Sequence, residues 1–498
     1  MVVSGGLSWW QVVDARQLAT RPDNPQVIAA QRSALRGSIF DARGTLLASS
    51  VVINGISRRT YLDSGFTNVI GYASLRFGTT GIERAFNDLL LGQADPNPLR
   101  DIVNDVLART PEPKDLTLTI DKRLQDFAQA QLGGSAGAVV AIDPRTGAIL
   151  SMVTAPTFNA SPISGDPAVA AQPMALLQVN PSKPLIDRAR IGVYTPGSIM
   201  KVLTASAAMD SGAITPQTTF PDQPKQEVSG FLVDGFNIRE HDLGSLRPAL
   251  WNLSQAIQVS SNIYFAHVGL AVGAETMLDT ARRFGFCAPI TIGPADRALS
   301  ARASYLTAPA ANGDCSPFTD RVELASAAFG QARVNVTPLQ MALLASTIAN
   351  DGLMPEPFIV RDVRAHQGDP RKGPSPTIIE RFSSPGEQRA VGPQAAGEVR
   401  SAMVDAVQGP LGRLYAGAGS VTLYGVSGVS TAGKTGTAQR GAGQAPHSWF
   451  IGFAPAQNGA TPAIAVAVIV EGGGAGSGRA APIGGRVMAE WLKLLAAG

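Results

Sequence analysis

The sequence has little cysteine, and the two cysteines it has are far from other metal ligands. Cys287 and Cys315 are the only two in 498 residues, and no partners stand around them at metal-ligand spacing. The pair is therefore either two separate thiols or one disulfide, and we expect the disulfide if the protein lies outside the cytoplasm. We predict no metal site.

Long apolar runs are also missing. No stretch of eighteen or more apolar residues occurs, so no segment of this sequence is expected to span a bilayer. Residues 1–13 are apolar but too short, and they include Trp9 and Trp10, a pair typical of a membrane interface. Two interpretations remain: an ordinary amphipathic start, or the outer remnant of a truncated N-terminal membrane anchor, which we favour.

Strong charge is absent as well. Charged residues make up 16% of the chain and the net charge is +3, so the sequence has no basic stretch typical of nucleic-acid binding. An apolar content of 45% supports a sizeable core, and the length predicts two or three domains. Only eight of the 41 basic residues are lysines, which makes each lysine a candidate for a specific role.

The order of predicted elements indicates an α+β protein. Residues 14–134 are expected to form a smaller mixed N-terminal domain of short strands and helices, with a linker-rich stretch at 93–114. Residues 135–498 begin with two strands, continue with a long helical insertion, and end with three more strands and a helix. This order predicts an antiparallel five-stranded sheet covered by helices, with a helical subdomain.

The first motif with chemical meaning is Ser198-Ile199-Met200-Lys201, which follows a Pro-Gly break. The break predicts that Ser198 lies in the first turn of a helix, where backbone N–H groups are unpaired. Three residues later, Lys201 would share its face. A neutral lysine amine can activate a serine hydroxyl if burial or another cation lowers its pKa. The bland alternative is a solvated helix start with an exposed lysine.

A second motif, Ser260-Ser261-Asn262, is the only Ser-x-Asn in the chain. The Ser260 hydroxyl could relay a proton between the lysine and a leaving amine, and the Asn262 carboxamide could hold a substrate peptide group. The alternative is capping or loop hydrogen bonding, the usual use of Ser and Asn.

The third motif is Lys434-Thr435-Gly436-Thr437. Glycine suits a strand edge that a substrate backbone approaches closely. Lys434 would supply the second cation that keeps Lys201 neutral, and the two threonine hydroxyls could bind a substrate carboxylate. Backbone N–H groups of Ser198 and Thr437 would form an oxyanion hole.

A phosphate-binding loop is a rival interpretation of this third motif, because residues 428–435 formally fit the pattern G-x-x-x-x-G-K-[ST]. That loop needs a strand before it and a helix after it. Glycines at 436, 441 and 443 and Pro446 disfavour the helix, so we reject this interpretation.

The ordered set Ser-x-x-Lys, Ser-x-Asn and Lys-Thr-Gly resembles that of the penicillin-binding proteins, and in particular the monofunctional class B transpeptidases of the penicillin-binding protein A group. Residues 137–147, 180–188, 337–340 and 447–455, and segments of 36–92, carry the rest of the resemblance. The chain departs from the group at Ile199 and Met200, where Thr and Phe are usual, so the shape of the cleft is expected to differ.

The resemblance implies a serine β-lactamase/transpeptidase-like fold and a D,D-transpeptidase. Ser198 would be the acylated nucleophile, Lys201 the base and Ser260 the proton shuttle. Asn262 would anchor substrate, with Lys434, Thr435, Gly436 and Thr437 at the substrate carboxylate. The substrates would be stem peptides ending in D-Ala-D-Ala, with β-lactam antibiotics as inhibitors and no metal or organic cofactor.

The resemblance also implies a place for the protein and leaves rivals open. The catalytic domain would lie outside the cytoplasmic membrane on a single N-terminal anchor. Membrane glycan polymerases and other cell-wall proteins would be partners in cell division or cell shape. A D,D-carboxypeptidase would use the same residues with water as acceptor, and a β-lactamase or a non-catalytic cell-wall scaffold is a further alternative.

Overall fold

The computed structural model describes residues 34–53, 56–93, 112–243, 246–384, 386–415, 428–441, 443–457 and 459–498. The predicted anchor remnant at residues 1–13 lies outside the described residues. Within the described part of the chain, no helix combines the length and the apolarity that crossing a membrane requires. The chain divides into two compact units, which are described separately below.

Unit 1 contains residues 1–117, 158–180 and 362–381. It is built on a six-stranded sheet whose strands run, in spatial order, β15 (Ile378–Arg381), β14 (Val360–Ala365), β6 (Lys114–Leu118), β1 (Ile39–Phe40), β2 (Leu46–Ile53) and β3 (Ile56–Tyr61). Strand β1 pairs parallel with β6 and antiparallel with β2, which continues antiparallel to β3. The short hairpin β4 (Ala73–Ser74) and β5 (Gly78–Thr79) and helices α4 (Thr67–Ile70), α5 (Gly81–Ala85), α6 (Asn87–Leu90) and α9 (Ala171–Val179) complete it.

Unit 2 contains residues 118–157, 181–361 and 382–498. Its sheet has the spatial order β17 (Ala432–Ala438), β18 (His447–Ala454), β19 (Ile464–Val470), β7 (Gly137–Ile142) and β8 (Ile149–Ala155). All four neighbouring pairs are antiparallel. The predicted five-stranded antiparallel sheet is thus confirmed, with β17 as an edge strand.

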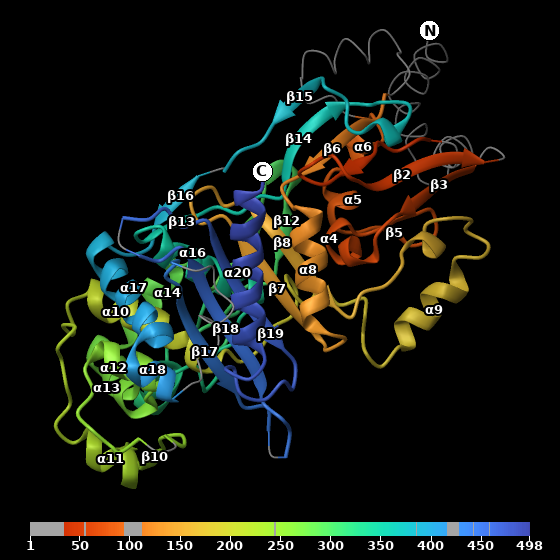
Figure 1. Cartoon of the computed structure of the whole chain (residues 1–498). Coiled ribbons are helices and arrows are strands. Elements are labelled where there is room, and N and C mark those ends of the chain that lie inside the picture. Colours follow the sequence, from red (N-terminus) through yellow and green to blue (C-terminus); the bar gives the residue numbers. More distant parts are fainter. Residues whose placement is uncertain are drawn as a thin grey trace, which may run out of the picture. The chain divides into compact units, whose positions relative to one another are not determined.

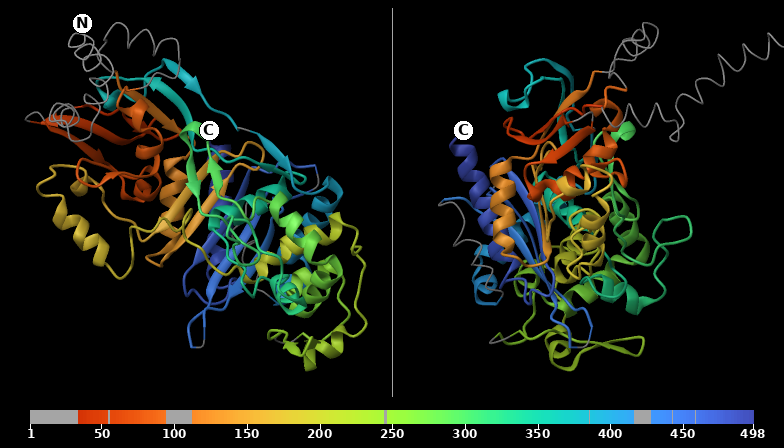
Figure 2. Two further views of the ribbon diagram at one scale, coloured as in Figure 1. Left: turned by 180° about the vertical axis from the view of Figure 1, so that it is seen from behind. Right: turned by 90° about the vertical axis from the view of Figure 1, so that its right-hand side faces the viewer.

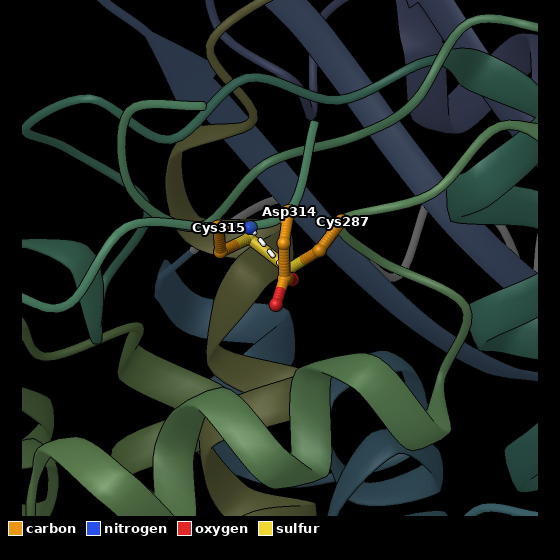
Figure 3. A group of neighbouring side chains, drawn as sticks. All are labelled: Cys287, Asp314 and Cys315. Atoms are coloured by element: carbon orange, nitrogen blue, oxygen red, sulfur yellow. Dashed lines mark hydrogen bonds between the residues drawn. A yellow bond between two sulfur atoms is a disulfide. The ribbon is translucent and has the colours of Figure 1, made fainter. Parts of the chain in front are cut away.

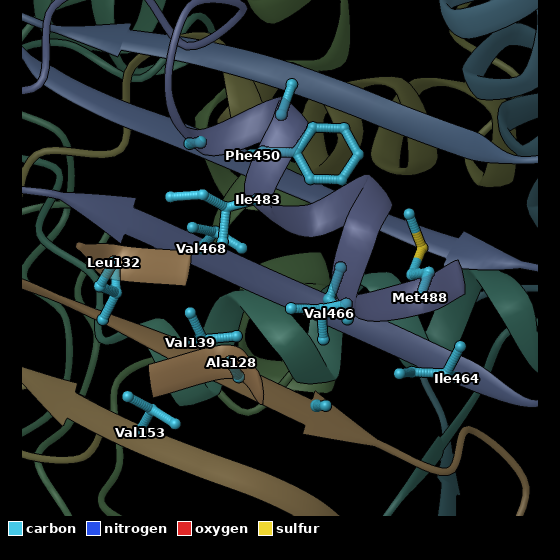
Figure 4. Packing of buried hydrophobic residues seen from close by; sticks show 14 of the residues in the cluster. Ala128, Leu132, Val139, Val153, Phe450, Ile464, Val466, Val468, Ile483 and Met488 are labelled. Carbon is cyan, nitrogen blue, oxygen red and sulfur yellow. The ribbon is translucent and has the colours of Figure 1, made fainter. Parts of the chain in front are cut away.

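Two helices close one face of this sheet, α8 (Lys122–Leu132) and α20 (Ala480–Ala496). Side chains of both helices share a buried apolar cluster with alternate residues of the strands, among them Val139, Val468 and Phe450 (Figure 4). The fully buried helix α16 (Pro338–Ala349) contacts β7, β18 and β19. Figure 2 shows helices on both sides of the sheet, so its central strands are apolar throughout.

Helices form the rest of unit 2 (Figure 1). They are α10 (Lys201–Asp210), α11 (Gln223–Ser229), α12 (Leu253–Val259), α13 (Asn262–Val272), α14 (Ala274–Arg283), α15 (Arg321–Ala327), α17 (Pro393–Gln408) and α18 (Pro410–Tyr415). Three two-stranded antiparallel sheets accompany them: the hairpin of β9 (Phe231–Val233) and β10 (Phe236–Ile238), β11 (Ile290–Ile292) with β12 (Leu299–Ala301), and β13 (Leu353–Pro355) with β16 (Glu387–Arg389).

The boundaries of the two units differ from the domain boundary at residue 134 that we predicted from the sequence. Helix α8 belongs to unit 2, because Leu124, Ala128 and Leu132 pack into the core of the five-stranded sheet. Strand β15 and most of β14 belong to unit 1, because they extend its sheet beyond β6. Pairing between segments that are distant in the chain leaves no local pattern in the sequence, so the order of the elements does not predict it.

The two cysteines are joined: Cys287 and Cys315 form a disulfide whose Cα atoms are 5.1 Å apart. Asp314 lies beside the sulfurs (Figure 3), and one of its carboxylate oxygens accepts a hydrogen bond of 2.7 Å from the backbone N–H of Cys315. A bonded pair of sulfurs offers no thiolate, so these three side chains are not a metal site in this state.

We expect the disulfide to stabilise unit 2 substantially. It closes a loop of 28 residues, for which the loss of loop entropy in the unfolded chain corresponds to about 3–4 kcal/mol. Replacing both cysteines with serine should lower the free energy of unfolding by that order, measured by urea denaturation. The parent protein unfolded in a reductant should show a similar loss, and an unchanged midpoint in both experiments would contradict this estimate.

Candidate active site

Ser198 lies on a 3₁₀ turn, Gly197–Met200, that leads directly into α10. The prediction placed it in the first turn of an α-helix, and the tighter turn has the same consequence, because residues three apart eclipse one another in a 3₁₀ helix. The Lys201 side chain therefore lies against Ser198, with 3.0 Å between Nζ and Oγ. Lys201 has no exposed surface, which excludes the solvated alternative.

Ser260 and Asn262 meet at the junction of two helices and turn toward the same lysine. Ser260 ends α12 in the left-handed conformation (φ 58°), and Asn262 begins α13. Lys201 Nζ lies 3.2 Å from Ser260 Oγ and 2.8 Å from Asn262 Oδ1, and it also donates to the Ser260 carbonyl. The predicted juxtaposition of both side chains is present, although Asn262 here binds the lysine.

Lys434 is the second lysine that contacts Ser260. It projects from the edge strand β17 and is 3% exposed, and its Nζ donates to Ser260 Oγ at 2.8 Å. The Ser260 hydroxyl thus lies between two lysine amines. The Gly-Lys-Thr segment runs in a strand rather than from a loop into a helix, so the phosphate-loop interpretation does not describe this fold.

Burial sets the protonation of both amines. Removal from water holds the pKa of Lys201 well below its ordinary value, the Lys434 ammonium lowers it further, and the carboxylate of Glu240 raises it. Burial also lowers the pKa of Lys434, to about 7. Two ammonium groups cannot both stay charged at low cost around one hydroxyl, so the arrangement favours a neutral Lys201 amine that can accept a proton.

Two glycines let the serine turn and the edge strand touch. A Cβ on Gly436 would lie 2.8 Å from the Pro196 carbonyl oxygen, and one on Gly197 would lie 2.7 Å from the Thr437 carbonyl oxygen. The predicted pair of oxyanion donors, the backbone N–H groups of Ser198 and Thr437, therefore belong to adjoining segments. Its role as an oxyanion hole stays a prediction.

A cavity of about 350 Å³ opens over these groups. Of the predicted residues, Ser198, Ser260, Asn262, Thr435 and Thr437 line it. Both lysines lie buried beneath it, and Gly436 lies in β17 between the two threonines. All the predicted catalytic and substrate-binding residues thus come together at one place, within one unit.

Several lining residues were not predicted from the sequence. The cavity is also lined by His241, Asp242, Phe329, Gln331, Gln439, Ala475 and Ser477. A second cavity of about 680 Å³ shares five of its lining residues with the first and extends to Glu240 and the β9–β10 hairpin. These residues belong to no short motif, and the one available signal was the charged cluster Glu240-His241-Asp242 in an otherwise weakly charged chain.

The fold and the site match one class of protein, the serine acyltransferases of mixed α and β structure in which a lysine lies beside the serine. Comparison with known proteins identifies it more closely. Residues 137–489 match the family described as penicillin binding protein transpeptidase domain, and residues 36–115 match the penicillin binding protein A dimerisation domain. The chain therefore belongs to the penicillin-binding protein family, as one of its transpeptidases.

Individual relatives agree with this assignment. The chain is 34% identical to the peptidoglycan D,D-transpeptidase PbpA of Mycolicibacterium smegmatis and 33% identical to that of Mycobacterium tuberculosis, over 97% of this chain and 94% of each relative. Among solved structures, it resembles penicillin-binding protein A from M. tuberculosis in its imipenem acyl-enzyme complex. The TM-score is 0.77 at 31% identity, covering 93% of this chain and all of the other.

Proposed function

We propose that this protein cross-links peptidoglycan by two acyl transfers through an acyl-enzyme on Ser198. The observation that carries the proposal is the 3.0 Å contact between Ser198 Oγ and the fully buried Lys201 amine. Burial and the neighbouring Lys434 both lower the pKa of this amine. A serine hydroxyl needs such a base to become a nucleophile. The names of the relatives, peptidoglycan D,D-transpeptidases, supply the reaction type.

In the first transfer, Lys201 accepts the Ser198 proton as Oγ attacks the carbonyl carbon of a stem peptide's D-Ala-D-Ala bond. The C–N bond then breaks, and the leaving D-Ala amine receives a proton from the Lys201 ammonium through Ser260 Oγ, which lies 3.2 Å from Lys201 Nζ and 2.8 Å from Lys434 Nζ. The charge of Lys434 and the hydroxyls of Thr435 and Thr437 would hold the terminal carboxylate.

In the second transfer, an amine from a neighbouring stem peptide attacks the acyl carbonyl. The new C–N bond forms, the ester bond to Ser198 Oγ breaks, and Oγ recovers a proton through Lys201 as the amine loses one. The backbone N–H groups of Ser198 and Thr437 would stabilise the oxyanion in both steps. As β17 is an edge strand, its outer backbone groups are available to an extended peptide. Asn262 would contact the same peptide once Lys201 no longer holds its Oδ1.

The proposal extends to place and partners. A disulfide persists outside the cytoplasm and is rare within it, so the Cys287–Cys315 bond supports an extracytoplasmic catalytic unit. The proposal includes tethering of the catalytic unit to the cytoplasmic membrane by an N-terminal anchor, with membrane glycan polymerases as protein partners.

The test is to map where a penicillin reacts. A fluorescent penicillin should give a stable adduct, located by mass spectrometry on the peptide containing Ser198, and Ser198→Ala should not be labelled. Labelling that survives this substitution would overturn the assignment, and rapid turnover of the adduct would indicate a β-lactamase. With D-Ala-D-Ala stem peptides, release of D-Ala without a cross-linked product in the presence of acceptor would favour the carboxypeptidase alternative. No adduct and no release would favour the scaffold.

A further inference from the structure

A buried carboxylate contacts the start of α13, beside the Ser260–Asn262 turn. Glu240 belongs to the segment after β10, and its side chain is 2% exposed. One of its oxygens accepts from the backbone N–H of Asn262 at 2.8 Å. The other accepts from the Ser261 hydroxyl at 2.7 Å and the Ile263 N–H at 3.1 Å. A residue 21 to 23 positions earlier in the chain thereby holds three donors at the start of α13.

These contacts satisfy the start of α13, whose first N–H groups have no partner within the helix. Ser261 caps the helix by accepting from the Tyr264 N–H at 3.1 Å, so its own proton is left to donate to Glu240. The negative charge also lies at the positive end of the helix dipole, where it is stabilising. Glu240 and Ser261 together therefore fix the first turn of α13.

The turn needs such support because its conformation is unfavourable by itself. Ser260 has a positive φ of 58°, which a residue other than glycine adopts only when its surroundings impose it. The catalytic contacts depend on that turn, since the Ser260 hydroxyl, the Ser260 carbonyl and Asn262 Oδ1 all lie within hydrogen-bond distance of Lys201 Nζ. Displacement of the start of α13 would move Ser260 and Asn262, two of the residues that contact Lys201.

We propose that Glu240 is a positioning residue, which holds Ser260 and Asn262 against Lys201 by binding the first turn of α13. The inference rests on the proposed function, because it concerns the acylation of Ser198. Glu240 lines the larger cavity beside the site, yet its oxygens are engaged by the helix start and by His241. It therefore acts through the motif and not on the substrate.

The charge of Glu240 also acts on the base. The groups that face Lys201 are Lys434, which lowers its pKa, Glu240, which raises it, and the uncharged Ser198, Ser260, Asn262 and Phe265. Glu240 itself faces Lys201, Glu227 and His241, whose Nδ1 lies 2.7 Å from Glu240 Oε1. Removing its charge should lower the pKa of Lys201 and shift the acid limb of the acylation rate to lower pH.

The experiment measures the second-order rate of labelling by a fluorescent penicillin from pH 5 to 9 in the full chain. Glu240→Gln should label Ser198 about 10- to 100-fold more slowly at pH 8, with its acid limb about half a pH unit or more lower. Glu240→Asp keeps the charge but shortens the reach, so its rate should fall while its limb stays near the wild-type position. Both should retain a cooperative thermal transition.

Glu227→Gln is the matched control. Glu227, on α11, is a second carboxylate near Ser261, but it lies 3.4 Å from that hydroxyl and binds Trp251 Nε1 and Gln223 instead. The labelling rate of Glu227→Gln should stay within about twofold of wild type, because the single contact of Glu227 with the motif is a long hydrogen bond. His241→Gln is a second control, which shows whether the imidazole contributes to the acid limb of the labelling rate.

The outcomes separate the two proposals. Wild-type rate and wild-type limb in Glu240→Gln would overturn the positioning role, as would a limb that moves only in His241→Gln. An equal loss of rate in Glu240→Gln and Glu240→Asp with no movement of either limb would reduce Glu240 to a structural residue. If Glu240→Gln does not fold, the limb of Glu240→Asp decides, because a displaced limb there would overturn the proposal. Labelling of Ser198→Ala would instead defeat the proposed function, whatever Glu240 does.

Discussion

Replacing Lys201 with arginine is expected to slow the acylation of Ser198 by about 10²–10⁴-fold, the usual contribution of a general base. Arginine stays protonated at any pH a protein tolerates, so it can hold the Ser198 hydroxyl but cannot take its proton. The native lysine is fully buried, and burial together with Lys434 favours its neutral form. The substitution therefore replaces a neutral base with a long side chain that is permanently cationic.

The measurement is the rate of labelling by a fluorescent penicillin, with thermal unfolding as the check on folding. Lys201→Met, which can neither donate nor accept a proton, should lose at least as much. Lys493→Arg is the control, because that side chain is 73% exposed on α20 and lies in no cavity described here. Labelling of Lys201→Arg at the wild-type rate would mean that another group accepts the Ser198 proton.

The chemistry of this site could be predicted from the sequence because it depends on short local patterns. Ser198 and Lys201 are three residues apart, so a single helical turn brings them together. The glycine at 436 was expected at a strand edge, and the structure places it where a Cβ would meet the Pro196 carbonyl oxygen. The central strands were recognisable from their continuous apolar runs, such as residues 464–470.

What was missed depends on contacts between distant segments. Glu240 binds Ser261 and Asn262 from 21 and 22 residues away in the chain, at no spacing that a motif defines. The same limit applies to α8. Its apolar face is recognisable in the sequence, but its packing against β8 and α20 is not. Strand β14 lies 240 residues from β6 in the chain but neighbours it in the sheet, and no local pattern encodes that pairing.

Replacing Glu83 with alanine is expected to lower the stability of unit 1 by about 3–5 kcal/mol, the cost of leaving buried charges without their partner. Glu83, on α5, is fully buried between two guanidinium groups. Arg36 Nη2 lies 2.8 Å and Arg59 Nε 2.6 Å from its oxygens, and the Tyr61 hydroxyl donates at 3.1 Å. Burial alone would raise the pKa of Glu83, but the two arginines hold it below its ordinary value, so the carboxylate stays charged.

Loss of this carboxylate leaves two buried cations facing each other, whereas loss of a surface pair changes little. Arg371→Ala is the control in the same unit, because the Arg371 side chain is 85% exposed, and no measurable change in stability is expected. Urea unfolding followed by far-ultraviolet circular dichroism should show an earlier transition for Glu83→Ala alone. Ser198 and its partners all belong to unit 2, so penicillin labelling below that transition should continue at the wild-type rate. An unchanged transition would contradict the importance of the ion pairs, and a loss of labelling with both units folded would mean that unit 1 supports the chemistry directly.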